Sequence, residues 1–66
     1  MLKSEITKEI YDELEKLDYF EKIERGLKLD LVNIFDVYGY GIDTIKLYQE
    51  DGKYYFEYTI YKGGLD

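Results

Sequence analysis

The sequence contains no cysteine, no histidine and no proline, and each absence excludes something. Without cysteine the chain cannot be stapled by disulfides, and without cysteine and histidine it lacks the usual zinc ligands. The same two absences remove the commonest general base and the thiol nucleophile of enzymes. The lack of proline argues against a long linker or a disordered tail. We therefore expect a folded chain that is not an enzyme, holds no metal or cofactor and resides in the reducing cytoplasm.

Long hydrophobic runs are missing as well, because no more than three apolar residues follow one another. Nothing in the sequence is therefore expected to span a membrane or to act as a secretory signal. The hydrophobic content of 45% is typical of a folded protein. With 66 residues, we expect one small α+β domain over residues 1–66 with a marginal core.

The charge is strongly unbalanced, with a net value of −6 spread along the chain. Such a protein is repelled by nucleic acid and by anionic membranes and attracted to basic surfaces. We therefore expect a basic protein surface as the partner, without direct binding of nucleic acid or membrane. The nine tyrosines point the same way, because tyrosine is enriched at protein interfaces.

The clearest element is a β-hairpin over residues 42–62, with Asp51-Gly52 as its turn. Both central residues of a two-residue type I′ turn need a positive φ, which glycine accepts freely and aspartate tolerates. This turn fixes the register of the two strands. The predicted pairs are Glu50–Lys53, Gln49–Tyr54, Tyr48–Tyr55, Leu47–Phe56, Lys46–Glu57, Ile45–Tyr58 and Thr44–Thr59.

Side chains alternate between the two faces of such a hairpin. The apolar face, which should pack under a helix, collects Ile45, Leu47, Tyr54, Phe56, Tyr58 and Ile60. The other face, which should meet water or a partner, collects Thr44, Lys46, Tyr48, Tyr55, Glu57, Thr59 and Tyr61.

The N-terminal part reads as a helix that Ser4 caps, with Glu5 in its first turn. An apolar stripe at helical spacing supports it, formed by Ile6, Ile10, Leu14 and Leu17. After Leu17 the helical phase slips, which suggests a break near residue 18. Charged pairs four residues apart nonetheless favour more helix as far as Gly26, the expected C′ residue. A continuous helix over 4–25 and a helix broken near 18 both remain open.

Residues 27–38 are predicted as a strand, because they alternate at first and are then rich in β-branched and aromatic residues. Leu31, Ile34, Phe35 and Tyr38 also fit a helical turn. Gly39-Tyr40-Gly41 should be a turn, and Gly63-Gly64 should end the hairpin. The predicted fold is α+β, with one N-terminal helix packed on a three-stranded antiparallel sheet in the order αβββ.

Two surfaces are candidates for binding a partner. The acidic side of the predicted helix carries Glu5, Glu9, Asp12 and Glu13. It is either an ordinary solvated face, as an Asp12–Lys16 pair would indicate, or a row of carboxylates that imitates phosphates. The tyrosine face of the sheet carries Tyr48, Tyr55 and Tyr61, edged by Glu57. Its tyrosines either merely suit strands or form a contact surface.

Small, acidic, tyrosine-rich domains of this kind resemble phage-encoded inhibitors of host enzymes. Segment 42–56, Ile-Asp-Thr-Ile-Lys-Leu-Tyr-Gln-Glu-Asp-Gly-Lys-Tyr-Tyr-Phe, is similar to the central hairpin of anti-CRISPR proteins with one helix and three strands. Segment 51–55, Asp-Gly-Lys-Tyr-Tyr, followed by Glu57-Tyr58, is similar to a hairpin of the phage uracil-DNA glycosylase inhibitors. These inhibitors act as DNA mimics, so the resemblance implies competition with nucleic acid for a basic groove. It transfers no individual functional residue.

Two functions are therefore expected. The first is a stoichiometric inhibitor that mimics nucleic acid and blocks the basic groove of a host nucleic-acid enzyme, such as a CRISPR effector nuclease. The alternative is a non-enzymatic protein–protein interaction module, including a homodimer formed through the tyrosine face or a free sheet edge.

Overall fold

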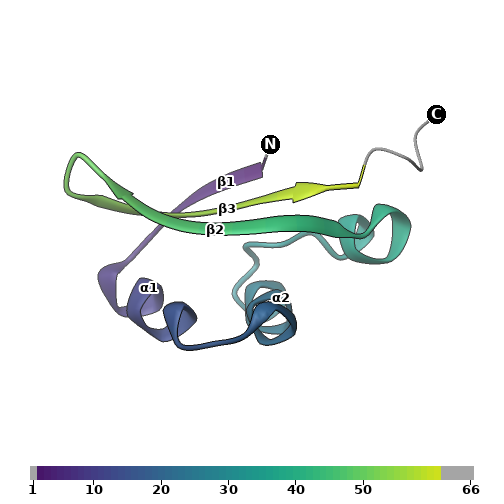
Figure 1. Cartoon of the computed structure of the whole chain (residues 1–66), viewed down its shortest axis with the longest axis horizontal. Helices are drawn as coiled ribbons and strands as arrows, with labels where there is room; N and C mark the ends of the chain where they lie inside the picture. The colour runs from purple at the N-terminus through teal and green to yellow at the C-terminus, as the bar shows by residue number, and fades with distance from the viewer. Residues whose placement is uncertain (1, 62–66) are drawn as a thin grey trace.

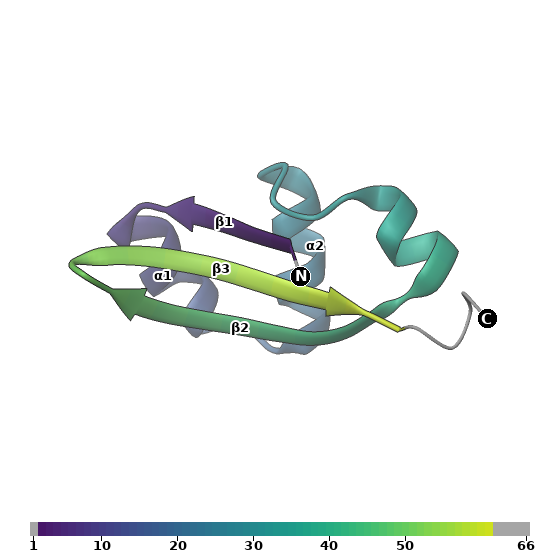
Figure 2. The ribbon, with the colours of Figure 1, turned by 90° about the horizontal axis from the view of Figure 1, so that it is seen from above.

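A computed structural model describes residues 2–61 of the chain. Two helices lie under one face of a three-stranded antiparallel sheet (Figure 1). The strand order is β1-β3-β2, so β3 is central and both β1 and β2 are edges (Figure 2). The elements in chain order are β1 (Leu2–Ile6), α1 (Lys8–Glu15), α2 (Tyr19–Lys28), the π-helical segment η1 (Asp36–Tyr40), β2 (Ile42–Glu50) and β3 (Lys53–Ile60).

The hairpin of β2 and β3 is confirmed, including its turn and its register. Asp51 and Gly52 have φ of 53° and 76°, as a type I′ turn requires. All seven predicted pairs, from Glu50–Lys53 to Thr44–Thr59, are present. The register shifts only between Ile42 and Thr44, where the strand has an irregularity. The expected end of the hairpin at 63–64 lies outside the described residues.

The helix predicted to begin at Ser4 is wrong, because residues 2–6 form strand β1. This strand pairs with β3, from Leu2 opposite Tyr58 to Ile6 opposite Tyr54. Thr7 is the N-cap of α1, and its Oγ1 accepts a hydrogen bond from the Ile10 backbone N–H at 3.2 Å. The α+β class and the three antiparallel strands are confirmed, but the order is βααββ with a π-helical segment before the hairpin.

The predicted break near residue 18 is confirmed, and the continuous helix over 4–25 is wrong. Asp18 caps α2 by a capping box. Its carboxylate accepts from the Glu21 N–H at 2.8 Å, and the Glu21 carboxylate accepts from the Asp18 N–H at 3.1 Å. The backbone N–H groups of Asp18 and Glu21 are thereby satisfied, so a second helix begins at Tyr19.

The strand predicted over 27–38 is wrong, because α2 continues through Lys28. The helix ends in a Schellman motif, with Asp30 at φ 61° and the Leu31 N–H donating to the Gly26 carbonyl at 2.8 Å. Gly26 is therefore inside the helix rather than its C′ residue. The alternative helical reading of the later residues is the correct one.

Residues 34–40 are helical and end in η1, so the turn expected at Gly39-Tyr40-Gly41 is replaced by the end of this segment. The Gly41 N–H donates to the Asp36 carbonyl at 2.7 Å, a bond that spans five residues as in a π-helix. Gly41 has φ of 86° and leads directly into β2.

The core lies between the sheet and the two helices. The predicted inner face of the hairpin is confirmed, with Phe56 and Tyr58 buried and its remaining members packed against them. Phe56 and Leu14 have no exposed surface at all. The buried hydrophobic residues are Ile6, Leu14, Val32, Ile42, Phe56 and Tyr58.

The hydroxyl group of Tyr58 connects this core to the segment before η1. It donates to the Asp36 carboxylate at 2.7 Å and accepts from the Asn33 backbone N–H at 3.1 Å. Burial of the hydroxyl group raises the pKa of Tyr58 above its usual value of 10.0, and the bond to Asp36 adds to this rise. The neutral hydroxyl can therefore hold both partners in place.

Two neighbouring aromatic residues of β3 should respond very differently to truncation. Phe56→Ala should destabilise the fold by about 3–5 kcal/mol, because its ring is completely buried. Tyr55→Ala, on the opposite face, should lower the free energy of unfolding by only about 1 kcal/mol. Urea denaturation of both variants measures this contrast. A larger loss for Tyr55→Ala would mean that the two faces are reversed.

Two helical glycines provide a second matched pair. A Cβ at Gly26 would lie 2.7 Å from Cγ2 of Val32, whereas a Cβ at Gly39 would meet nothing within 4 Å. Gly26→Ala should therefore destabilise by about 1–3 kcal/mol through overpacking. Gly39→Ala should be neutral or stabilising by about 0.5–1 kcal/mol, since the unfolded chain loses freedom. Equal melting temperatures for the two variants would contradict the close packing at Gly26.

Candidate partner-binding surfaces

The open face of the sheet carries a connected group of side chains from all three strands. The rings of Tyr48 and Tyr55 lie 5.4 Å apart between centroids. The Lys3 ammonium of β1 lies 4.4 Å from the Tyr55 centroid and 5.5 Å from that of Tyr48. The Tyr48 hydroxyl group donates to the Glu57 carboxylate at 3.0 Å. The interaction of the Lys3 ammonium with the Tyr48 hydroxyl group raises the pKa of Lys3.

This connected group limits what the tyrosine face can offer a partner. Glu57 is only 8% exposed, because it sits on the central strand between Lys3 and Lys46 on the neighbouring strands. Tyr48 and Tyr55 are half-buried, partly beneath the Lys3 side chain. The open face is therefore engaged with its own side chains more fully than the sequence suggested.

The predicted acidic row is divided between two elements. Glu5 lies on β1 opposite Tyr55, so it belongs to the open face of the sheet. Glu9, Asp12 and Glu13 lie on α1, as expected. Asp12 pairs with Lys8 at 2.8 Å rather than with Lys16, and Glu13 pairs with Arg25 of α2. Two carboxylates of the row are thus partly neutralised by the chain itself.

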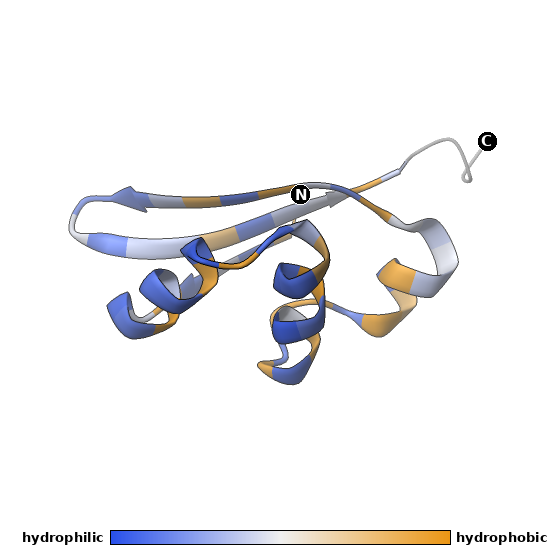
Figure 3. Ribbon diagram, turned by 60° about the horizontal axis from the view of Figure 1, so that its bottom comes forward, coloured by the Kyte–Doolittle hydropathy of each residue, from blue (hydrophilic) through white to orange (hydrophobic). Residues whose placement is uncertain are grey.

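Another surface stands out by exposure, and sequence reasoning missed most of it. Phe20 and Phe35 are each 77% exposed, and Tyr38 is 80% exposed. The segment between α2 and β2 also shows hydrophobic (orange) stretches in Figure 3. We call this surface the aromatic end and define it by Tyr19, Phe20, Phe35, Tyr38, Tyr40 and Tyr61.

A hollow of about 590 Å³ opens within the aromatic end, between α2 and the start of β2. Tyr19 and Phe20 meet edge to face there, with 5.3 Å between ring centroids. The Tyr19 hydroxyl group donates to the Ile42 carbonyl, and burial raises the pKa of Tyr19. Of the residues that the structure describes, Glu24 is the one charged residue that lines this hollow. The hollow is therefore apolar with a negative edge.

Of the eight predicted partner-binding residues, only Tyr61 lies at the aromatic end. Phe35 and Tyr38 were not grouped with this surface because residues 27–38 were assigned to a strand. The helical spacing of Ile34, Phe35 and Tyr38 was the signal that could have revealed them. The capping box at Asp18 could likewise have placed Phe20 in the first turn of a new helix.

Residues 2–61 offer neither a candidate metal site nor a candidate membrane-spanning helix. This part of the chain brings together no group of three or more acidic, cysteine or histidine side chains that could hold a metal ion. Its helices are too short or too polar to cross a bilayer. Comparisons with protein families, with characterised proteins and with solved structures found nothing that matches this chain.

Proposed function

We propose that the chain is a non-enzymatic protein-binding domain that docks on another protein through its aromatic end. The observation that supports this proposal is the exposure of Phe20, Tyr38 and Tyr61 around one apolar hollow, together with the exposure of Phe35. Covering apolar surface releases about 25 cal/mol per Å², and aromatic residues supply much of the binding energy of interfaces. Large exposed apolar patches on small proteins typically mark interaction sites.

The charges around the aromatic end favour a basic partner over a second copy of the chain. Glu24 lines the hollow, the negative charge of Asp43 adds to the rise in the pKa of Tyr19 that burial causes, and no lysine or arginine within residues 2–61 lines the hollow. A second copy would bring the same carboxylates and the same net charge of −6, so repulsion opposes a homodimer here. A homodimer through the tyrosine face has less support, because Lys3 already covers Tyr48 and Tyr55.

Selection of peptides from a random displayed library tests this docking surface. Peptides enriched on the wild-type protein should bind Phe20→Ser/Tyr38→Ser at least about tenfold more weakly, a loss of about 1.4 kcal/mol. Both side chains are mostly exposed, so the double variant should keep its fold, as circular dichroism can verify.

The control is the double variant Tyr48→Ser/Tyr55→Ser on the open face of the sheet. Its affinity for the same peptides should match that of the wild type. Peptides that depend on the tyrosine face and ignore the aromatic end would contradict the proposal.

A second candidate function is an inhibitor that imitates nucleic acid, and one observation favours it. Asp18, the N-cap of α2, and Glu21 and Glu24 within α2 are exposed, and none of them is in a salt bridge with residues 2–61. Spaced three residues apart, they rise along the helix by about 4.5 Å per step. This second proposal thus shifts the row of phosphate-like carboxylates from α1 to α2, beside the aromatic end.

Inhibition assays on purified nucleases and DNA glycosylases, CRISPR effector nucleases included, test this second function. Inhibition should weaken as substrate DNA or salt rises, because both compete with contacts between acids and bases. Glu21→Lys/Glu24→Lys should abolish it, whereas Glu9→Lys/Asp12→Lys should reduce it less. Inhibition that neither DNA nor the α2 charge reversal relieves would argue against nucleic-acid mimicry.

A further inference from the structure

Two hollows follow one another along the outer edge of β1. One, of about 560 Å³, is lined by residues 2–4 of the strand, and the other, of about 440 Å³, by residues 5–7. Residues 27–34, from the end of α2 into the segment that follows it, line the opposite side of both hollows, and Ile10 of α1 also lines the second. Together they form a groove along the full length of β1, which we call the β1 groove.

The main chain of β1 faces this groove at two residues. A two-residue hairpin turn makes Glu50–Lys53 a hydrogen-bonded pair, and such pairs alternate along an antiparallel ladder. Tyr55 and Glu57 therefore bond to β2, and the three residues that bond to β1 are Tyr54, Phe56 and Tyr58. Their partners on β1 are Ile6, Ser4 and Leu2.

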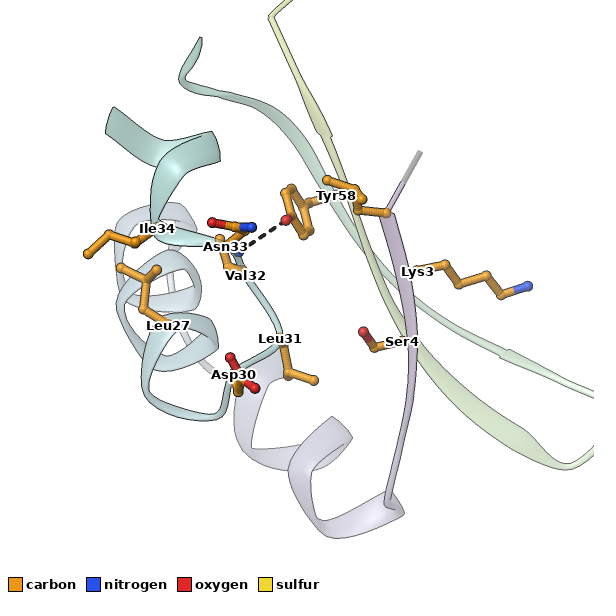
Figure 4. A pocket seen from close by; sticks show the side chains of 10 residues that line it. Lys3, Ser4, Leu27, Asp30, Leu31, Val32, Asn33, Ile34 and Tyr58 are labelled. Atoms are coloured by element: carbon orange, nitrogen blue, oxygen red, sulfur yellow. Dashed lines mark hydrogen bonds between the residues drawn. The ribbon is translucent and has the colours of Figure 1, made fainter. Parts of the chain in front are cut away.

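The N–H and C=O groups of Lys3 and Glu5 consequently point away from the sheet, into the β1 groove. Figure 4 supports this geometry, because the Lys3 side chain points away from the hollow that Lys3 lines. Its main chain is what reaches the hollow. Leu31 projects from the opposite wall toward β1 in the same view.

The charges of the groove are complementary to a basic occupant. Asp30 lines the first hollow. Glu5 borders the second hollow, and its side chain lies on the open face of the sheet, like that of Lys3. Among residues 2–61, Lys3 is the one basic residue of the lining, and its ammonium is engaged with the rings of Tyr48 and Tyr55. The Asp30 carboxylate therefore lies at the groove and the Glu5 carboxylate beside it on the open face, and no lysine or arginine side chain of the described residues is directed into the groove.

We propose that the β1 groove accepts an extended, basic segment of a partner protein as a fourth strand of the sheet. The outward groups of Lys3 and Glu5 form the main-chain hydrogen bonds, as in other cases of strand addition. Alternate apolar side chains of the segment face Leu31, and its basic side chains lie on the side of Glu5. This site is independent of the aromatic end, with which it shares only Leu27.

A capped six-residue peptide that alternates Lys and Val is the probe, titrated into the ¹⁵N-labelled full-length protein. We expect saturable shifts of the Lys3 and Glu5 amide signals and slower hydrogen exchange at both amides. Glu5→Pro removes an outward N–H but leaves the ladder to β3 intact, so it should weaken binding at least about tenfold.

Matched controls separate main-chain pairing from charge and from the proposed function. Gln49→Pro removes the equivalent outward N–H on the β2 edge and should leave the affinity unchanged. Glu5→Gln keeps the N–H and should weaken binding less than Glu5→Pro. Phe20→Ser/Tyr38→Ser should bind the probe normally, so failure of the aromatic end and failure of the groove give different results.

Three results would overturn the proposal. The first is the absence of saturable shifts, and the second is a set of shifts confined to β2. The third is unchanged binding by both of two N-methylated peptides, one methylated at its Lys amides and the other at its Val amides, because strand addition needs one of these two alternating sets of donors. The N-methylated peptides leave the protein unaltered and so remain decisive even if Glu5→Pro fails to fold.

Discussion

The buried hydroxyl group of Tyr58 joins the central strand of the sheet to the segment that carries the exposed aromatic residues. It is bonded at once to the backbone of Asn33 and to the carboxylate of Asp36. Losing either bond would leave a polar group unpaired next to the core, at a cost of about 1–3 kcal/mol. The path of the chain between α2 and β2 therefore depends on this one group, and so does the placement of the aromatic end.

The hairpin could be predicted from the sequence because its determinants are local. Asp51-Gly52 sets the turn, the turn sets the register, and alternation then assigns each face. The N-terminus could not be read this way. Ser4 and Glu5 form a plausible helix start, but pairing with β3 outweighs that local preference and moves the cap to Thr7. A tertiary contact, absent from any local pattern, decided the element.

The candidate sites were predictable to a smaller extent than the fold. Tyr48, Tyr55 and Glu57 share the open face as predicted, whereas Tyr61 lies at the aromatic end instead. The burial of Glu57 follows from β1 covering the far side of β3, which the predicted topology lacked. Glu5 lies on the open face of the sheet rather than on the acidic side of a helix, again because residues 2–6 form β1. The aromatic end depends on a Schellman motif with Asp30 at positive φ, where a glycine is the usual signal. Sequence reasoning therefore placed Phe35 and Tyr38 in a strand.

Both proposed surfaces lie where the helices and strands of this small fold leave groups uncovered. Two short helices cover one face of the sheet, and nothing within residues 2–61 pairs with the outer edge of β1 or forms a layer over the exposed residues beyond α2. In a domain of this size the core can bury only part of the apolar surface. A partner that covers the aromatic end or extends the sheet would complete what the chain itself leaves open.

Backbone order in residues 35–40 is the most direct test of this account, measured by ¹⁵N relaxation in the wild type and in Tyr58→Phe. If the hydroxyl group of Tyr58 holds the aromatic end in place, wild-type order parameters there should match those of β3, near about 0.85. In Tyr58→Phe they should fall in residues 35–40 while those of β3 stay unchanged. Wild-type values below about 0.6 in this segment, or no difference between the two proteins, would contradict the claim that Tyr58 organises the binding surface.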